Sequence, residues 1–183
     1  MKCASCQFEL STAFAFCPAC GQKVSAAQAA PAVAAHADRR MATVLFADLS
    51  GFTSISERLD PEDVRALQTD LFAVLREAVE RYGGFVEKFV GDGLMAVFGA
   101  PLAHEDDPQR AVRTALDMHE GANALSQRWL PRLGHPLTLH IGINSGRVVA
   151  GTIGSGPDAA FAVTGDTVNT AARLQSAAAA GQT

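Results

Sequence analysis

The chain has 183 residues, a net charge of −4 and the apolar and charged content of an ordinary globular protein. Its acidic balance excludes a general attraction to nucleic acid or to anionic membranes. No apolar run reaches the length of a membrane span, and the N-terminus lacks the apolar core of a secretory signal, so we expect a cytoplasmic protein.

The first twenty residues contain all four cysteines, arranged as two CxxC pairs ten residues apart: Cys3, Cys6, Cys17 and Cys20. This spacing predicts four thiolates around one structural Zn²⁺, in a zinc ribbon over residues 1–23. Two disulfides or a redox CxxC are the alternatives, and the lack of a secretory signal disfavours the disulfides. Because its only basic residues are Lys2 and Lys23, we expect the ribbon to contact a protein or act as a spacer rather than bind nucleic acid.

Residues 24–40 are rich in alanine and interrupted by Pro31, which predicts a linker. The segment 41–50 then predicts a buried strand, and 51–84 predicts two helical pieces. Pro61 begins the second piece, because proline followed by acidic residues favours a helix N-terminus.

Two short apolar runs, 85–90 and 94–99, flank Gly91-Asp92-Gly93 and predict a β-hairpin. The remaining pattern predicts a long helix over 107–129, strands at 137–144, 147–154 and 159–165, and a helix from Asp166. The order is βααββαβ with an extra βα tail. It indicates an α+β, ferredoxin-like domain over residues 41–183, with an antiparallel sheet and helices packed on one face.

Asp48 and Asp92 should converge in this topology, because the first strand runs antiparallel to the strand after the hairpin. Two neighbouring carboxylates repel unless a cation lies between them, and oxygen ligands without His or Cys favour Mg²⁺ or Mn²⁺. The free N–H groups of the helix start after Asp48 would bind a phosphate. Together these features point to phosphoryl or nucleotidyl transfer. The alternative is that Asp92 is a turn residue and Asp48 a helix cap.

Four motifs in the same region carry a family resemblance: VLFADLSGFTSISERLDPEDV, FVEKFVGDGLMAVFGAP, LHIGINSGRVVAGTIGS and FAVTGDTVNTAARLQ. From Met41 to Thr183 the sequence resembles a class III adenylyl/guanylyl cyclase catalytic domain. The leading zinc ribbon is similar to the ribbon that some bacterial cyclases carry before the catalytic domain, and FGAPLAHEDDPQRAV resembles the soluble branch of the family. The resemblance implies a homodimer that converts ATP to cyclic AMP and pyrophosphate in intracellular signalling, with nucleotide bound between the protomers.

The resemblance also implies a role for each site residue. Two Mg²⁺ or Mn²⁺ ions would be held by the side chains of Asp48 and Asp92 and by the backbone of Leu49. The triphosphate would contact the backbone around Phe52 and Thr53 and the side chain of Arg147. From the partner protomer, Asn169 would orient the ribose and Arg173 would stabilise charge on the α-phosphate.

Lys88 and Ala162 occupy the two positions where the family reads the purine. A lysine at the first position is similar to adenylyl cyclases, because it can donate to adenine N1. Alanine at the second departs from the family pattern and offers no side-chain hydrogen bond. We therefore expect ATP as the substrate, with a guanylyl cyclase as the alternative.

The chain stops before the strands in which the family carries a phosphate-binding lysine. We therefore interpret it as incomplete at the C-terminus and expect low or no turnover from residues 1–183 alone. A non-catalytic module that keeps the cyclase fold and dimer surface is the alternative outside the enzyme class. A diguanylate cyclase is disfavoured, since no GGDEF-type run is present.

Overall fold

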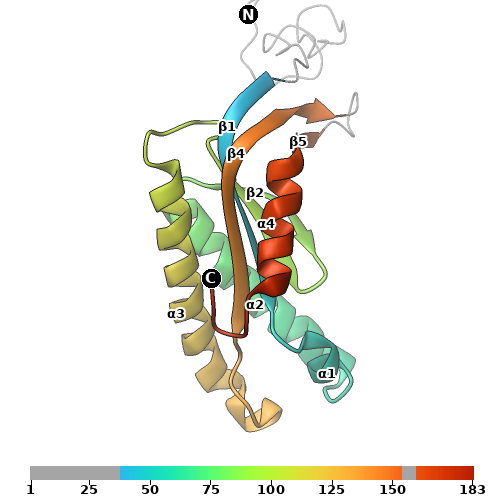
Figure 1. Ribbon diagram of the computed structural model, residues 1–183. Coiled ribbons are helices and arrows are strands. Elements are labelled where there is room, and N and C mark those ends of the chain that lie inside the picture. The colour runs from blue at the N-terminus through green and yellow to red at the C-terminus, as the bar shows by residue number, and fades with distance from the viewer. Residues whose placement is uncertain (1–37, 154–159) are drawn as a thin grey trace, which may run out of the picture. The chain divides into compact units, whose positions relative to one another are not determined.

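The computed structural model describes residues 38–153 and 160–183 (Figure 1). The predicted zinc ribbon and most of the predicted linker lie outside the described residues, so both stay predictions. No helix within the described ranges has the length and apolar character needed to cross a membrane.

A five-stranded antiparallel sheet forms the centre of the domain, in the order β2-β3-β1-β4-β5. Its strands are β1 (Asp38–Leu49), β2 (Phe85–Val90), β3 (Gly93–Phe98), β4 (Leu139–Ile153) and β5 (Ala160–Thr164). The first strand begins at Asp38, within the segment predicted as linker. The antiparallel sheet and the predicted hairpin between β2 and β3 are confirmed.

Four helices connect and cover the strands: α1 (Phe52–Ser56), α2 (Pro61–Arg81), α3 (Asp107–Leu133) and α4 (Asp166–Ala177). Pro61 is the first residue of α2, where its missing N–H costs no hydrogen bond. The end of α3 is set by Gly134, whose φ of 74° is accessible to glycine at low cost.

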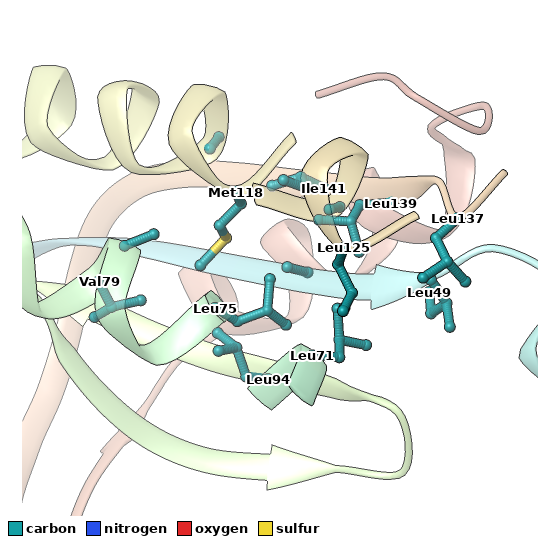
Figure 2. Close-up of a cluster of buried hydrophobic side chains, with 14 of the residues drawn as sticks. Leu49, Leu71, Leu75, Val79, Leu94, Met118, Leu125, Leu137, Leu139 and Ile141 are labelled. Carbon is teal, nitrogen blue, oxygen red and sulfur yellow. The ribbon is translucent and has the colours of Figure 1, made fainter. Parts of the chain in front are cut away.

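Helices α2 and α3 pack on one face of the sheet and enclose the main hydrophobic core (Figure 2). Alternate residues of each strand face these helices, as the period of two in a strand requires. Figure 2 shows Leu49 and Leu94 from the sheet meeting Leu71 and Leu75 from α2 and Met118 from α3.

Helix α4 lies on the opposite face of the sheet, so the prediction that all helices share one face was wrong (Figure 1). Its contacts involve Val168 and Ala171, which pack with Val44 of β1 and Val163 of β5. The sheet therefore has helices on both faces. Gly142 of β4 permits a very close approach, because a Cβ there would overlap the backbone of α4.

The long strand β4 replaces the two separate strands that were predicted at 137–144 and 147–154. The predicted break between them lies at Ser145-Gly146, two residues common in turns. In the structure these residues pair with Thr43 and Ala42 of β1, within an uninterrupted ladder of twelve pairs.

Candidate active site

The acidic pair of Asp48 and Asp92 is brought together by strand pairing. Asp48 is the next-to-last residue of β1, and Asp92 lies in the two-residue loop between β2 and β3. β1 and β3 are antiparallel neighbours with Ala47 opposite Leu94, so the end of one strand lies beside the start of the other. The spatial proposal made from the sequence is therefore supported by the register.

The electrostatics at Asp92 are consistent with two neighbouring carboxylates. Burial, then charge repulsion and a hydrogen bond involving Asp48, raise the pKa of Asp92 from 3.8 to about 6. Backbone N–H groups of Asp92 itself and of Leu49 act in the opposite direction, because they stabilise the charged form. The backbone of Leu49 therefore lies at the same place as the two acids.

One oxygen of the pair is suited to a cation. Oδ1 of Asp48 is buried and accepts no hydrogen bond within the described residues. Such an atom is costly unless a ligand satisfies it. The described parts of the chain contain no cluster of three or more His, Cys, Asp or Glu side chains around it. This donor set fits Mg²⁺ or Mn²⁺, which are bound by one or two carboxylates, with water and substrate phosphates as the other ligands.

Gly93 makes this close arrangement possible, a role that the sequence reading missed. A Cβ at Gly93 would lie 2.8 Å from Oδ1 of Asp48 and would also overlap the carbonyl oxygen of Ala47. The signal in the sequence is the second glycine of Gly91-Asp92-Gly93, which we had assigned only to the turn.

We expect Gly93→Ala to damage both the fold and the acidic pair. The added methyl group meets backbone, which cannot rotate away, so the free energy of unfolding should fall by about 2 kcal/mol. The carboxylate of Asp48 should also move, and Mn²⁺ affinity should fall by at least about tenfold. Chemical denaturation and Mn²⁺ titration measure the two effects. Val90→Ala, an exposed change across the same hairpin, is the control; equal Mn²⁺ affinity in both variants would contradict this role of Gly93.

Phe52 and Thr53 stand at the start of α1, directly after the strand that carries Asp48. Gly51, with a φ of 73°, turns the chain from β1 into this helix. Ile55 is fully buried and anchors α1 to the core. The predicted phosphate-binding backbone is therefore held close in sequence and space to the acidic pair.

Arg147 is not brought to the acidic pair of its own chain. It pairs with Met41, whereas Asp48 pairs with His140, seven positions away along β4. At about 3.3 Å per residue the separation is roughly 23 Å. Arg147 instead lines a pocket of about 490 Å³ with Arg39 and Arg40. The predicted phosphate contact is not supported at the acids of the same protomer.

His140, and not Arg147, lies beside Asp48. Its Nε2 lies 3.8 Å from Oδ2 of Asp48, and the side-chain nitrogen of Gln175 on α4 lies 3.2 Å from both ring nitrogens. The pairing register, rather than any local motif, places it at the site.

The two predicted base-reading residues lie on the outer strands of the sheet, Lys88 on β2 and Ala162 on β5. These strands are at opposite ends of the sheet order, yet the rings of Phe85 and Phe161 meet with centroids 5.5 Å apart. Lys88 lies three residues from Phe85, and Ala162 is next to Phe161. The two outer strands therefore approach each other where these rings meet, although Lys88 and Ala162 are 74 residues apart in sequence.

A β-bulge in β2 decides which face of the sheet Lys88 occupies. Strict alternation along the strand would put Lys88 on the same face as Val86, but the bulge between these residues shifts the register. Val86 packs against the core beneath α2 and α3, whereas Lys88 is opposite Met95, whose side chain belongs to the α4 face. The lysine is about half exposed.

Asn169 and Arg173 lie one turn apart on α4, and both are exposed. The guanidinium of Arg173 donates a 3.1 Å hydrogen bond to Thr170 and is 73% exposed. The helix packs on the sheet through Ala171, so these two exposed side chains are available to another molecule.

Comparison with known proteins identifies relatives of this domain. Residues 35–183 match the family model of the adenylate and guanylate cyclase catalytic domain. An adenylate cyclase of Mycobacterium tuberculosis (strain ATCC 25618 / H37Rv) is 38% identical over 141 residues, which are 77% of this chain and 31% of that protein. The chain spans 28% and 21% of the adenylate cyclases matched in Anabaena cylindrica and Rhizobium meliloti (strain 1021).

Two solved structures share the fold. The guanylyl cyclase Cya2 superposes with a TM-score of 0.75 at 39% identity, covering 79% of this chain and 74% of that chain. The adenylyl cyclase CyaB from P. aeruginosa gives 0.76 at 34% identity, covering 80% and 76%. Similar structures therefore include proteins named for either nucleotide.

Proposed function

Because the chain belongs to the adenylate and guanylate cyclase catalytic domain family, we propose that it forms cyclic AMP and pyrophosphate from ATP. The observation that carries the proposal is the convergence of Asp48 and Asp92, with a buried oxygen of Asp48 left without a hydrogen bond. A family member that only assembled would have no physical need for two repelling carboxylates at this place.

The reaction joins the ribose 3′-oxygen to the α-phosphorus and breaks the bond from that phosphorus to the bridging oxygen of pyrophosphate. The carboxylates of Asp48 and Asp92 and the backbone of Leu49 would hold two divalent ions. A bound Mg²⁺ or Mn²⁺ would lower the pKa of the ribose 3′-hydroxyl and would neutralise negative charge on the triphosphate. The backbone at Phe52 and Thr53 would bind the phosphates through its N–H groups.

The partner protomer would complete the site, since Asn169 and Arg173 lie exposed on α4. In a homodimer, Asn169 would orient the ribose and Arg173 would stabilise charge on the α-phosphate. A phosphate contact by Arg147 would likewise have to involve another protomer. His140, 3.8 Å from Asp48, is the histidine next to the proposed ion site.

Lys88 favours ATP over GTP, because an ammonium can donate to adenine N1 but not to the N1–H of guanine. Ala162 weakens that selection, and relatives named for both nucleotides are present. A guanylyl cyclase is therefore the second candidate, and the specific observation in its favour is the missing side-chain acceptor at Ala162.

We expect Asp48→Ala to lower cyclic AMP formation from MnATP by at least about a hundredfold, since bound metal supplies several kcal/mol of transition-state stabilisation. Product is measured by chromatography, with ATP and GTP as separate substrates, on a version that includes any polypeptide encoded after Thr183. Exposed Glu120→Gln on α3 is the control and should keep full activity. Product formation that survives Asp48→Ala would refute the two-metal assignment.

The non-catalytic alternative is separated by the same assay. A module that only dimerises would form no cyclic nucleotide with either substrate, yet would keep its oligomeric state. If the unsubstituted protein were folded but monomeric, that alternative would be excluded, because the module would not dimerise.

For the cysteine-rich N-terminus we propose one structural Zn²⁺ bound by the four thiolates, with a protein partner for the ribbon. The spacing of the cysteines supports this, as two CxxC pairs suit a tetrahedral site. Metal analysis of the purified chain should find one zinc per protomer, and replacement of Cys17 and Cys20 by serine should remove it.

A further inference from the structure

A β-bulge in β2 leaves Glu87 without a partner across the strand pair. Val86 pairs with Ala96 and Lys88 pairs with Met95, so Glu87 is the extra residue. Consecutive side chains of a regular strand point to opposite faces, but a bulge can turn two of them toward the same side. Glu87 and Lys88 meet in this way, with Nζ of Lys88 3.2 Å from Oε2 of Glu87.

The two members of this ion pair differ sharply in burial. The side chain of Glu87 is 7% exposed, whereas that of Lys88 is 53% exposed. Oε2 of Glu87 is enclosed and accepts no hydrogen bond from the described residues, so the ammonium lies at ion-pair distance but off the hydrogen-bond direction. A buried carboxylate in this state is costly and persists only where a cation compensates it.

The position of Glu87 and Lys88 in β2 suggests a function for the buried carboxylate. Lys88 lies three residues along β2 from Phe85, whose ring contacts Phe161 where the two outer strands of the sheet approach each other. Bulges are frequent next to active sites, where they re-aim a side chain. We propose that Glu87 is a positioning residue that holds the ammonium of Lys88 toward the nucleotide base and thereby sets the preference for adenine.

This inference rests on the proposed function, because it requires that Lys88 faces the base. A free lysine side chain has four rotatable bonds and can donate to adenine N1 or shift to guanine O6. An ammonium attracted to Glu87 has less freedom to shift, and it meets the N1–H of guanine unfavourably. Since the side chain of Ala162 offers no hydrogen-bond acceptor, the discrimination between adenine and guanine depends on how Glu87 restrains Lys88.

The test is the ratio of ATP to GTP affinity in Glu87→Gln, which keeps the shape of the side chain and removes its charge. Binding of non-cyclisable ATP and GTP analogues with Mn²⁺ is measured by calorimetry. We expect the ATP preference to fall about tenfold, because an ammonium released from Glu87 could shift to guanine O6. In turnover assays the change should appear in KM for ATP and not in kcat. Exposed Glu62→Gln on α2 is the control.

A second measurement tests the pair without nucleotide. Lys88→Met should lower the midpoint of denaturant unfolding, since it leaves Glu87 buried without its cation. The double variant Glu87→Gln with Lys88→Met should recover most of that loss, as expected for coupled residues. No recovery would overturn the pairing.

These measurements distinguish a failure of the role proposed for Glu87 from a failure of the proposed cyclase function. An unchanged ATP-to-GTP ratio in a folded Glu87→Gln protein overturns the inference alone and leaves Glu87 a structural residue. Failure of the unsubstituted protein to bind either nucleotide overturns the proposed function, and with it the inference, whereas the unfolding measurements then still report on the ion pair.

Discussion

Asp92→Ser should make the metal-free protein more stable at neutral pH while abolishing its response to divalent ions. Serine is small, neutral and acceptable in a turn, and it avoids an asparagine before Gly93, which would deamidate back to aspartate. The raised pKa of Asp92 means that its charge at pH 7 is carried at a cost in the folded state, which the substitution removes.

The pH dependence of this gain has a definite sign. The pKa of Asp92 is 3.8 in its ordinary state and about 6 in the fold, so the folded protein binds the proton more tightly. Below pH 4 the residue is protonated in both states and costs nothing. As pH rises to about 6 the fold loses stability, and above that the loss is constant. Each tenfold change in proton affinity corresponds to about 1.4 kcal/mol, which we reduce to about 1–2 kcal/mol in all because Asp92 is partly exposed.

Urea unfolding in EDTA, from pH 4 to pH 8, measures the gain for Asp92→Ser against the unsubstituted protein. Added Mn²⁺ should stabilise the unsubstituted protein and leave the variant unchanged. Glu120→Gln, which also removes one negative charge, should show neither effect. If Asp92→Ser were less stable at every pH, the two carboxylates could not be repelling each other.

Gly142→Ala should produce the largest loss of stability among single methyl additions in this domain. A Cβ at Gly142 would overlap the backbone nitrogen of Gln175 and the carbonyl oxygen of Ala171, and would lie 2.7 Å from the Cα of Gln175. These atoms belong to the backbone of α4, so no side-chain rotation relieves the overlap and the helix must move. We expect a loss of about 3 kcal/mol in the free energy of unfolding.

Thermal and urea unfolding of Gly142→Ala, beside the exposed control Thr152→Ala on the same strand, check this expectation. Because Asn169 and Arg173 are on the displaced helix, any cyclase activity should fall further than the folded fraction does. Stability within about 0.5 kcal/mol of the unsubstituted protein would show that α4 does not pack as closely as described.

The acidic pair could be predicted from sequence because it depends on two strong local signals. A strand that ends at Asp48 and a glycine-flanked turn at Asp92 are each readable alone, and antiparallel pairing then fixes their approach. The helix starts and the hairpin follow in the same way from Pro61, Gly91 and the spacing of apolar residues.

Other features depend on tertiary pairing that no local pattern carries. Helix α4 buries small residues such as Thr167 and Ala171 against glycines of β4, so it lacks the broad apolar stripe that would have indicated its face. An alternation rule cannot detect the bulge at Glu87, so it would put Lys88 on the same face of the sheet as Val86. The β1–β4 register alone decides that His140, and not Arg147, lies beside Asp48.

The uninterrupted ladder between β1 and β4 has a mechanical consequence. It runs from Asp38 to Leu49 of β1 with every residue of the strand paired. A force applied at Asp38 would therefore be transmitted along the two strands to Asp48, because no unpaired residue between them could absorb it. In the homodimer proposed above, such a force would change how the two protomers meet rather than the shape of either one.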